Sequence, residues 1–114
     1  MDAVENVDID GSGKFKYILI KVTDKATKES KFIVRGYERC GFHGDILDEV
    51  EPALQSKYTL DCVGGGRIIH HPDKKQIEVF GYSQGYGQAD HAKSIAILKT
   101  RYPDYSFTKS NEGY

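Results

Sequence analysis

The sequence predicts an α+β fold: a single domain in which two α-helices pack on a mixed five- or six-stranded β-sheet. Three observations lead to this prediction. Runs of β-branched and aromatic residues recur along the chain, two other segments carry apolar residues at helical spacing, and no internal repeat is present. The 114 residues are enough for one core and too few for separate cofactor and substrate domains.

The first two strands are expected at residues 14–22 and 31–37, which are separated by a charged connector. The middle of the first stretch is apolar at successive positions, as in a central strand that is buried on both faces. Gly36 predicts a bulge or a close backbone approach near the end of the second strand. Residues 1–13 are acidic and end in turn-forming types, so we interpret them as an N-terminal arm and residues 14–114 as the domain.

Further strands are expected at residues 58–63 and 67–71, with Gly64-Gly65-Gly66 as the break between them. Another strand is expected at residues 76–82, after turn-forming Pro72-Asp73. A short terminal strand at residues 105–108 precedes a polar tail.

A first helix is predicted from Asp45 onward, just after His43, because apolar residues recur at helical spacing and acidic residues occupy its opening turns. Pro52 lies inside this pattern and would remove a backbone hydrogen bond, so a kink or a break into two short pieces is expected there. A second helix is predicted over residues 89–102, with Pro103 just beyond its end.

Composition and charge exclude several classes of function. Lys and Arg number 16 against 17 Asp and Glu, so the chain lacks the strongly basic character of a nucleic-acid-binding protein. No apolar run approaches the roughly 20 residues that cross a bilayer, and the first residues lack the features of a secretory signal. Cys40 and Cys62 are interpreted as free thiols in a reducing cytoplasm. The charge balance and the lack of a long apolar run lead us to expect no nucleic-acid or membrane partner, and because no long apolar stripe marks an interface we expect a monomer.

The most informative local feature is the glycine-rich segment 81–87, which leads from a predicted strand into the second helix. Glycines let backbone N–H groups turn toward an anion, and the adjoining helix N-terminus adds donors and a partial positive charge. Ser83 would add a hydroxyl donor, and Gln84 and Gly85 would complete the loop. Taken alone, such a segment is more often an ordinary connector.

His43 stands between two glycines where the first predicted helix begins. An unperturbed pKa of about 6.5 suits an imidazole to accept a proton at cellular pH, although a lone histidine is more often a surface or capping residue. Lys16, Arg35 and Arg67 are candidate cations for the oxygens of a phosphoryl group, and each is otherwise a solvated charge.

No metal site is predicted, because Cys40 and His43 have a C-x2-H spacing but a second pair of ligands is missing. Cys62 and Arg67 flank a segment that resembles the loop of cysteine phosphatases. Four residues separate them where that loop has five, so a phosphocysteine mechanism is not expected.

Several short segments occur in a characteristic order along the chain. They are Asp8-Ile9-Asp10 with Phe15-Lys16-Tyr17, Ile33-Val34-Arg35-Gly36-Tyr37, His43 followed by Asp45-Ile46, Gly64-Gly65-Gly66-Arg67-Ile68, Tyr82-Ser83 with Tyr86-Gly87, and Tyr102-Pro103-Asp104-Tyr105. Together they resemble the phosphohistidine phosphatase family of the Janus/Ocnus type, which includes the insect Janus proteins. The resemblance runs from about residue 7 to the end, and the ordered set is far more specific than any single motif.

The resemblance implies an enzyme that hydrolyses the P–N bond of phosphohistidine in proteins, with no metal and no cofactor. By this similarity, His43 matches the catalytic residue that accepts a proton, and Lys16 matches a substrate-binding lysine. Residues 83–85 match the loop that holds the phosphoryl group, and Arg67 has a supporting role. The expected partners are proteins that carry phosphohistidine, and the phosphate anion.

Two mechanisms are compatible with these residues. Neutral His43 would take a proton from the water that attacks phosphorus, while Lys16, Ser83 and the amides of residues 83–85 stabilise the equatorial oxygens. Alternatively, His43 attacks phosphorus itself and is transiently phosphorylated. Two other functions remain open at this point: a module that binds phosphoryl groups without catalysis, and an esterase for small phosphate monoesters.

Overall fold

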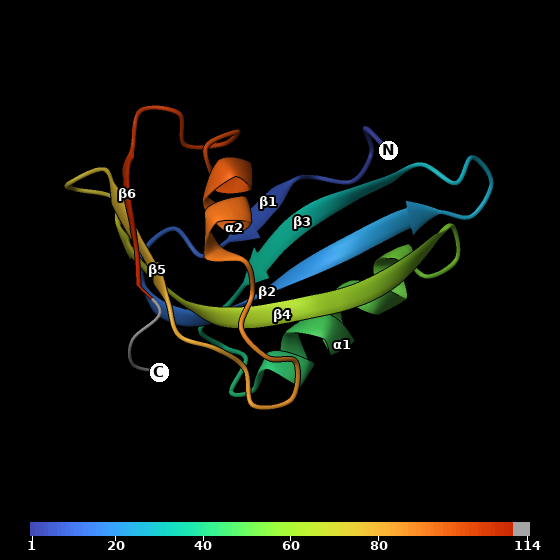
Figure 1. The fold of residues 1–114 in the computed structure, drawn as a ribbon, viewed down its shortest axis with the longest axis horizontal. Helices are drawn as coiled ribbons and strands as arrows, with labels where there is room; N and C mark the ends of the chain where they lie inside the picture. The colour runs from blue at the N-terminus through green and yellow to red at the C-terminus, as the bar shows by residue number, and fades with distance from the viewer. Residues whose placement is uncertain (111–114) are drawn as a thin grey trace.

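Strand β2 lies at the centre of the sheet, because it pairs antiparallel with β3 on one side and with β4 on the other. The full order is β1-β3-β2-β4-β5-β6, and the two outer strands run parallel to their neighbours. The computed structural model describes residues 1–110 and confirms the predicted α+β fold with a mixed sheet (Figure 1). The strands are β1 (Val7–Ile9), β2 (Gly13–Asp24), β3 (Ser30–Gly36), β4 (Tyr58–His71), β5 (Gln76–Phe80) and β6 (Ser106–Lys109).

Each face of the sheet carries one helix, α1 (His43–Leu54) or α2 (His91–Leu98) (Figure 1). Side chains alternate between the faces along β2. Ile18 and its neighbours on the same face therefore pack with α1, whereas Tyr17 and its neighbours pack in the core under α2. The central strand is thus buried on both sides, as its continuous apolar run predicts.

Strand β4 is continuous through its three glycines, so the predicted break at residues 64–66 is wrong. Leu19 of β2 pairs with Gly64 and Ile20 pairs with Cys62, which leaves Val63 as an extra residue in a β-bulge. Gly64 has a φ of 152°, and a Cβ on it would lie 2.6 Å from the backbone of Ala89. The glycines therefore admit another chain segment close to the strand instead of ending it.

The expected N-terminal arm contains β1, so regular structure begins at Val7 and not near Lys14. Val4 and Val7 are both buried. The strand that pairs with β1 is β3, more than twenty residues along the chain. A strand of three residues shows no periodicity of its own, and this parallel pairing is invisible to local pattern analysis.

Helix α1 runs unbroken to Leu54, so the predicted break at Pro52 is wrong. Pro52 lies in the last turn, where the lost hydrogen bond affects only the end of the helix. Ile46 and Val50 hold the preceding turns against the sheet.

Helix α2 is shorter than the predicted range 89–102. It begins after Asp90, whose side chain accepts a hydrogen bond from the Lys93 N–H at 3.1 Å and so caps the helix. In the described part of the chain, neither helix has the length and apolar composition of a membrane span. The predicted tail at residues 111–114 lies outside the described residues.

Candidate active site

His43 is the first residue of α1, and only 6% of its surface is exposed. The start of the helix is fixed by Asp45, whose carboxylate accepts a hydrogen bond from the Phe42 N–H at 3.0 Å. The imidazole Nε2 lies 2.9 Å from the carbonyl oxygen of Gly66 in β4. Because a carbonyl oxygen only accepts, Nε2 carries the proton and Nδ1 is the basic nitrogen of the ring.

The surroundings of His43 favour its neutral form. Burial is the main effect that lowers the pKa of this imidazole below its ordinary value of 6.5, and the positive charges of Lys16 and Arg67 lower it further. The hydrogen bond to Gly66 acts in the opposite direction but does not reverse the shift. The lowered pKa thus favours the neutral ring, with its one proton on Nε2, at neutral pH.

Gly65 in β4 is the point that both the start of α1 and the segment after β5 contact. A Cβ on Gly65 would lie 2.7 Å from Cδ2 of His43 and 3.1 Å from Cβ of Ser83. Both side chains thus rest on the strand at a point where only glycine leaves room. The triple glycine is the reason that two segments forty residues apart in the chain meet here.

Residues 83–87 form a tight turn. The Ser83 N–H donates to the Gly87 carbonyl at 3.1 Å, and the Gly87 N–H donates back to the Ser83 carbonyl at 2.8 Å. The Ser83 hydroxyl oxygen accepts from the Tyr86 N–H at 3.2 Å. The Ser83 amide, one of the predicted phosphoryl donors, therefore already has an acceptor within the turn.

The tip of this turn has free donors. Within residues 1–110, the amides of Gln84 and Gly85 donate to no other protein group. A Cβ on Gly85 would have open space around it. The turn itself is fixed to β4, because the Gly65 N–H donates to Gly87 and the Ala89 N–H donates to the Gly65 carbonyl, each at 3.0 Å.

A pocket of about 430 Å³ lies between the start of α1 and this turn. Its lining includes five of the predicted site residues: Lys16, His43, Ser83, Gln84 and Gly85. The remaining lining residues are Phe42, Gly44 and Tyr86. The structure thus brings a histidine, a lysine and the tip of the turn at 83–87 together around one cavity.

Arg67 lies beside this pocket. It pairs with Lys16 across β4 and β2, so the two side chains share one face of the sheet. Its charge contributes to the lowered pKa of His43. Arg67 lines a second pocket of about 320 Å³, which shares Lys16 with the first.

Arg35 is not brought into the site, so its predicted contact with substrate is not supported. Its guanidinium donates to the carbonyl of Glu5 at 2.8 Å and to its neighbour Val34 at 3.0 Å. The side chain is buried, which lowers its pKa. Arg35 instead binds the backbone of the N-terminal segment, which sequence analysis treated as an arm.

Sequence analysis missed the aromatic mouth of the pocket. Phe42 is 75% exposed although it is apolar, and Tyr86 is also partly exposed. Single exposed apolar residues are common on protein surfaces, but these two line the same cavity. The position of Phe42 next to His43 was the only sequence signal for it.

A second buried histidine supports the site from the opposite face of the sheet. His91 Nε2 donates to the Gly81 carbonyl at 2.9 Å, and His91 Nδ1 lies 2.6 Å from the Tyr17 hydroxyl. The Tyr17 hydroxyl also lies 2.9 Å from Ser94 Oγ. These contacts fix the position of Gly81, where the chain leaves β5 for the turn at 83–87.

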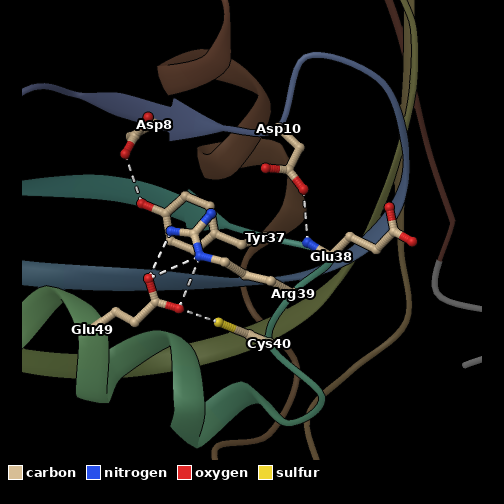
Figure 2. A network of polar contacts seen from close by, with 7 residues as sticks. All are labelled: Asp8, Asp10, Tyr37, Glu38, Arg39, Cys40 and Glu49. Carbon is tan, nitrogen blue, oxygen red and sulfur yellow. Dashed lines mark hydrogen bonds and ion pairs between the residues drawn. The ribbon is translucent and has the colours of Figure 1, made fainter.

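The loop before His43 is tied to the N-terminal segment, as Figure 2 shows. The Tyr37 hydroxyl donates to Asp8 at 2.7 Å, and the Glu38 N–H donates to Asp10 at 2.7 Å. Asp8 in β1 and Asp10 just after it thereby hold the chain segment that leads into α1.

The same loop is also tied to α1 (Figure 2). Glu49 forms an ion pair with Arg39 at 2.6 Å and accepts a hydrogen bond from the Cys40 thiol at 2.8 Å. Burial and the Glu49 carboxylate raise the pKa of Cys40 to about 11. Cys40 and Cys62 are both free thiols, as predicted. Among residues 1–110, no three His, Cys, Asp or Glu side chains form a cluster suited to a metal ion.

Comparison with known proteins gives consistent results. A family model described as the Janus/Ocnus family matches residues 1–106. The sex-regulated protein janus-A of Drosophila pseudoobscura pseudoobscura is 48% identical to this chain, over 95% of the chain and 76% of that protein. The 14 kDa phosphohistidine phosphatase of Sus scrofa is 47% identical over 97% of the chain and 93% of that protein. The corresponding Homo sapiens protein is 45% identical over 97% and 94%.

Proposed function

Because the chain belongs to the Janus/Ocnus family, we propose that it is a protein histidine phosphatase, which hydrolyses the P–N bond of phosphohistidine without a metal. Relatives from pig and human that bear the name phosphohistidine phosphatase support a phosphatase role. The observation that carries the proposal is the placement of His43, whose Nε2 is held by the Gly66 carbonyl at the edge of a pocket. The residue lines the same pocket as Lys16 and residues 83–85, and Nδ1 is the basic nitrogen of its ring.

In the proposed reaction, Nδ1 of His43 takes a proton from a water molecule as the water oxygen bonds to phosphorus. The P–N bond breaks, and its electron pair goes to the substrate imidazole, which takes up a proton from the protonated His43, directly or through solvent, so that His43 returns to its neutral form. The products are inorganic phosphate and an unmodified histidine side chain. The Nε2 hydrogen bond to Gly66 keeps the ring in the tautomer that this step needs.

Negative charge on the phosphoryl oxygens would be stabilised by three kinds of group. Lys16 supplies a positive charge, and it forms no ion pair with any carboxylate of residues 1–110. The amides of Gln84 and Gly85 supply backbone donors. The hydroxyl of Ser83 has its proton to donate, since its oxygen is the acceptor in the bond from Tyr86.

The leaving group also has a suitable contact surface. Phe42 presents an exposed aromatic ring at the mouth of the pocket, and Tyr86 lies on its other lining segment. A planar imidazole stacks favourably on such rings. This contact favours phosphohistidine over a phosphate monoester with an aliphatic leaving group.

Assays of His43→Ala and Lys16→Ala against a phosphohistidine peptide and a small phosphoramidate test the proposal. We expect His43→Ala to lose turnover of both substrates and Lys16→Ala to lose at least about tenfold in kcat/KM. His71→Ala is the matched control, because this histidine on β4 pairs with Glu78 and lines neither pocket. Undiminished activity of His43→Ala would contradict the mechanism.

Two further measurements separate the alternatives. Single-turnover labelling shows a phosphorylated enzyme only if Nδ1 attacks phosphorus directly. Turnover that persists in EDTA supports metal independence. If the protein instead binds the phosphohistidine peptide tightly without any turnover, it is a phosphoryl-binding module. We take the active form to be a cytoplasmic monomer, which sedimentation and fractionation would test.

A further inference from the structure

The pocket that adjoins the candidate site has an unusual set of charges. Three of its lining side chains are cations, and one is a carboxylate: Lys14, Lys16, Arg67 and Glu38. Its volume is about 320 Å³, and Phe15, Cys40 and Gly41 complete the lining. We call it the basic pocket. Because Lys16 also lines the pocket of His43, the two cavities are neighbours.

The cations of the basic pocket come from adjacent strands. Lys14 and Lys16 lie two residues apart in β2 and so project from the same face, and Arg67 pairs directly with Lys16. Neither lysine forms an ion pair within residues 1–110. The Lys14 Nζ instead lies 5.6 Å from the ring centroid of Phe80. The charges of these two lysines are not used to stabilise the fold through carboxylates of residues 1–110, and they remain available to an anionic ligand.

We propose that the basic pocket binds an Asp or Glu side chain of the protein substrate, two positions away from the phosphohistidine. This inference rests on the proposed function, because it takes the neighbouring pocket to hold the phosphohistidine. Lys14 would contact the substrate carboxylate, and Lys16 would lie between the carboxylate and the phosphoryl group. The basic pocket is thus a determinant of substrate sequence.

The spacing of two residues follows from strand geometry. Side chains two positions apart on one face of an extended chain are separated by about 6.6 Å, both in β2 and in an extended substrate peptide. An extended peptide that runs alongside β2 with its phosphohistidine at Lys16 would place the side chain two residues away at the level of Lys14. Glu38 limits the net charge of the pocket, which suits a carboxylate better than a second phosphoryl group.

The test compares phosphohistidine peptides that differ only by Asp or Asn, placed two residues before or two residues after the phosphohistidine. For the wild-type protein, kcat/KM should favour the Asp peptide by about fivefold at one of these positions at low salt. Lys14→Ala should abolish this preference, Lys14→Glu should reverse it, and Lys14→Arg should retain it. Lys21→Ala is the control, since Lys21 is an exposed lysine of the same strand that lines neither pocket.

Equal turnover of the Asp and Asn peptides at both positions would overturn the inference, as would a preference that survives Lys14→Ala. A small phosphoramidate tests the proposed function separately, because it has no Asp or Glu side chain for the basic pocket to bind. If it is not hydrolysed by the wild-type protein, the phosphatase assignment fails. In that case, binding of the same peptides with phosphoserine in place of phosphohistidine tests the basic pocket. The Asp version should shift the NMR signals of Lys14 and Arg67 and the Asn version should not; equal shifts would refute the proposal.

Discussion

A methyl group on Gly65 would lie 2.7 Å from Cδ2 of His43, so the imidazole ring rests directly on the backbone of β4. The same methyl group would lie 2.9 Å from the carbonyl oxygen of Tyr17 in the neighbouring strand. Neither neighbour has room to move away, because one is strand backbone and the other is held by Gly66.

Gly65→Ala should therefore displace His43 and loosen the strand pairing. We expect a loss of about 1–3 kcal/mol in the free energy of unfolding, typical of overpacking, and at least about a tenfold loss of kcat. Urea unfolding and turnover of a phosphoramidate measure the two effects. Gly11→Ala is the control, since a Cβ there has open space and should leave both quantities unchanged. Normal activity of Gly65→Ala would show that the position of the ring is not critical.

The lowered pKa of His43 predicts a one-sided pH dependence. Because the neutral ring is the active form, kcat/KM should stay constant near pH 7 and fall only as the pH drops below 6.5. NMR titration of the ring protons should give a pKa below 6.5. Lys16→Ala removes a positive charge that disfavours the imidazolium, so it should raise this pKa, whereas Lys21→Ala should not. A pKa of His43 above 6.5 in the wild-type protein would contradict the assignment.

The buried contact between Tyr17 and His91 predicts a loss of stability in Tyr17→Phe. The substitution removes a hydroxyl that lies within hydrogen-bonding distance of both His91 and Ser94, and it leaves their buried polar atoms without this partner. The expected cost is about 1–3 kcal/mol. Tyr58→Phe is the matched control, because Tyr58 is buried without a hydrogen bond from its hydroxyl among the described residues. Equal midpoints of urea unfolding for the two variants would contradict the prediction.

The Cys40–Glu49 contact predicts the reactivity of one thiol (Figure 2). Since Glu49 contributes to the raised pKa of Cys40, Glu49→Ala should lower that pKa and speed alkylation of Cys40 by iodoacetamide at pH 8. Cys62 serves as an internal reference. Asp48→Ala, which removes the adjacent exposed carboxylate, should leave the rate at Cys40 unchanged. Identical rates at Cys40 in both variants would refute a role for Glu49. Mass spectrometry of the labelled peptides measures both sites.

Local patterns predicted most of the secondary structure. In β2, β3 and both helices, the residue pattern that favours the element lies within the element itself. The prediction failed where a partner from far along the chain decides the structure. Three glycines in succession normally mark a loop, yet Gly64 to Gly66 continue β4 because β2 pairs with them. Val7 forms a strand only because β3 is available beside it.

The candidate site was less accessible to sequence analysis. His43 was a weak candidate by itself, and only the family resemblance made it a strong one. Arg35 illustrates the difficulty, since an arginine inside an apolar segment fits both an anion site and a structural role. The outcome depended on the backbone carbonyl of Glu5, whose proximity no local pattern encodes. The basic pocket was not predicted, because Lys14 and Arg67 come to line one cavity only once the strands are paired.

The attachment of both halves of the site to consecutive peptide units of β4 has a consequence for folding. His43 is anchored at Gly66 and the turn at 83–87 is anchored at Gly65, so neither half can detach without disturbing the strand beside the centre of the sheet. Catalytic competence should therefore appear in the same cooperative step as the sheet, late in refolding, with no partially structured species that retains activity. Amide exchange at Gly65 would then be as slow as global unfolding allows.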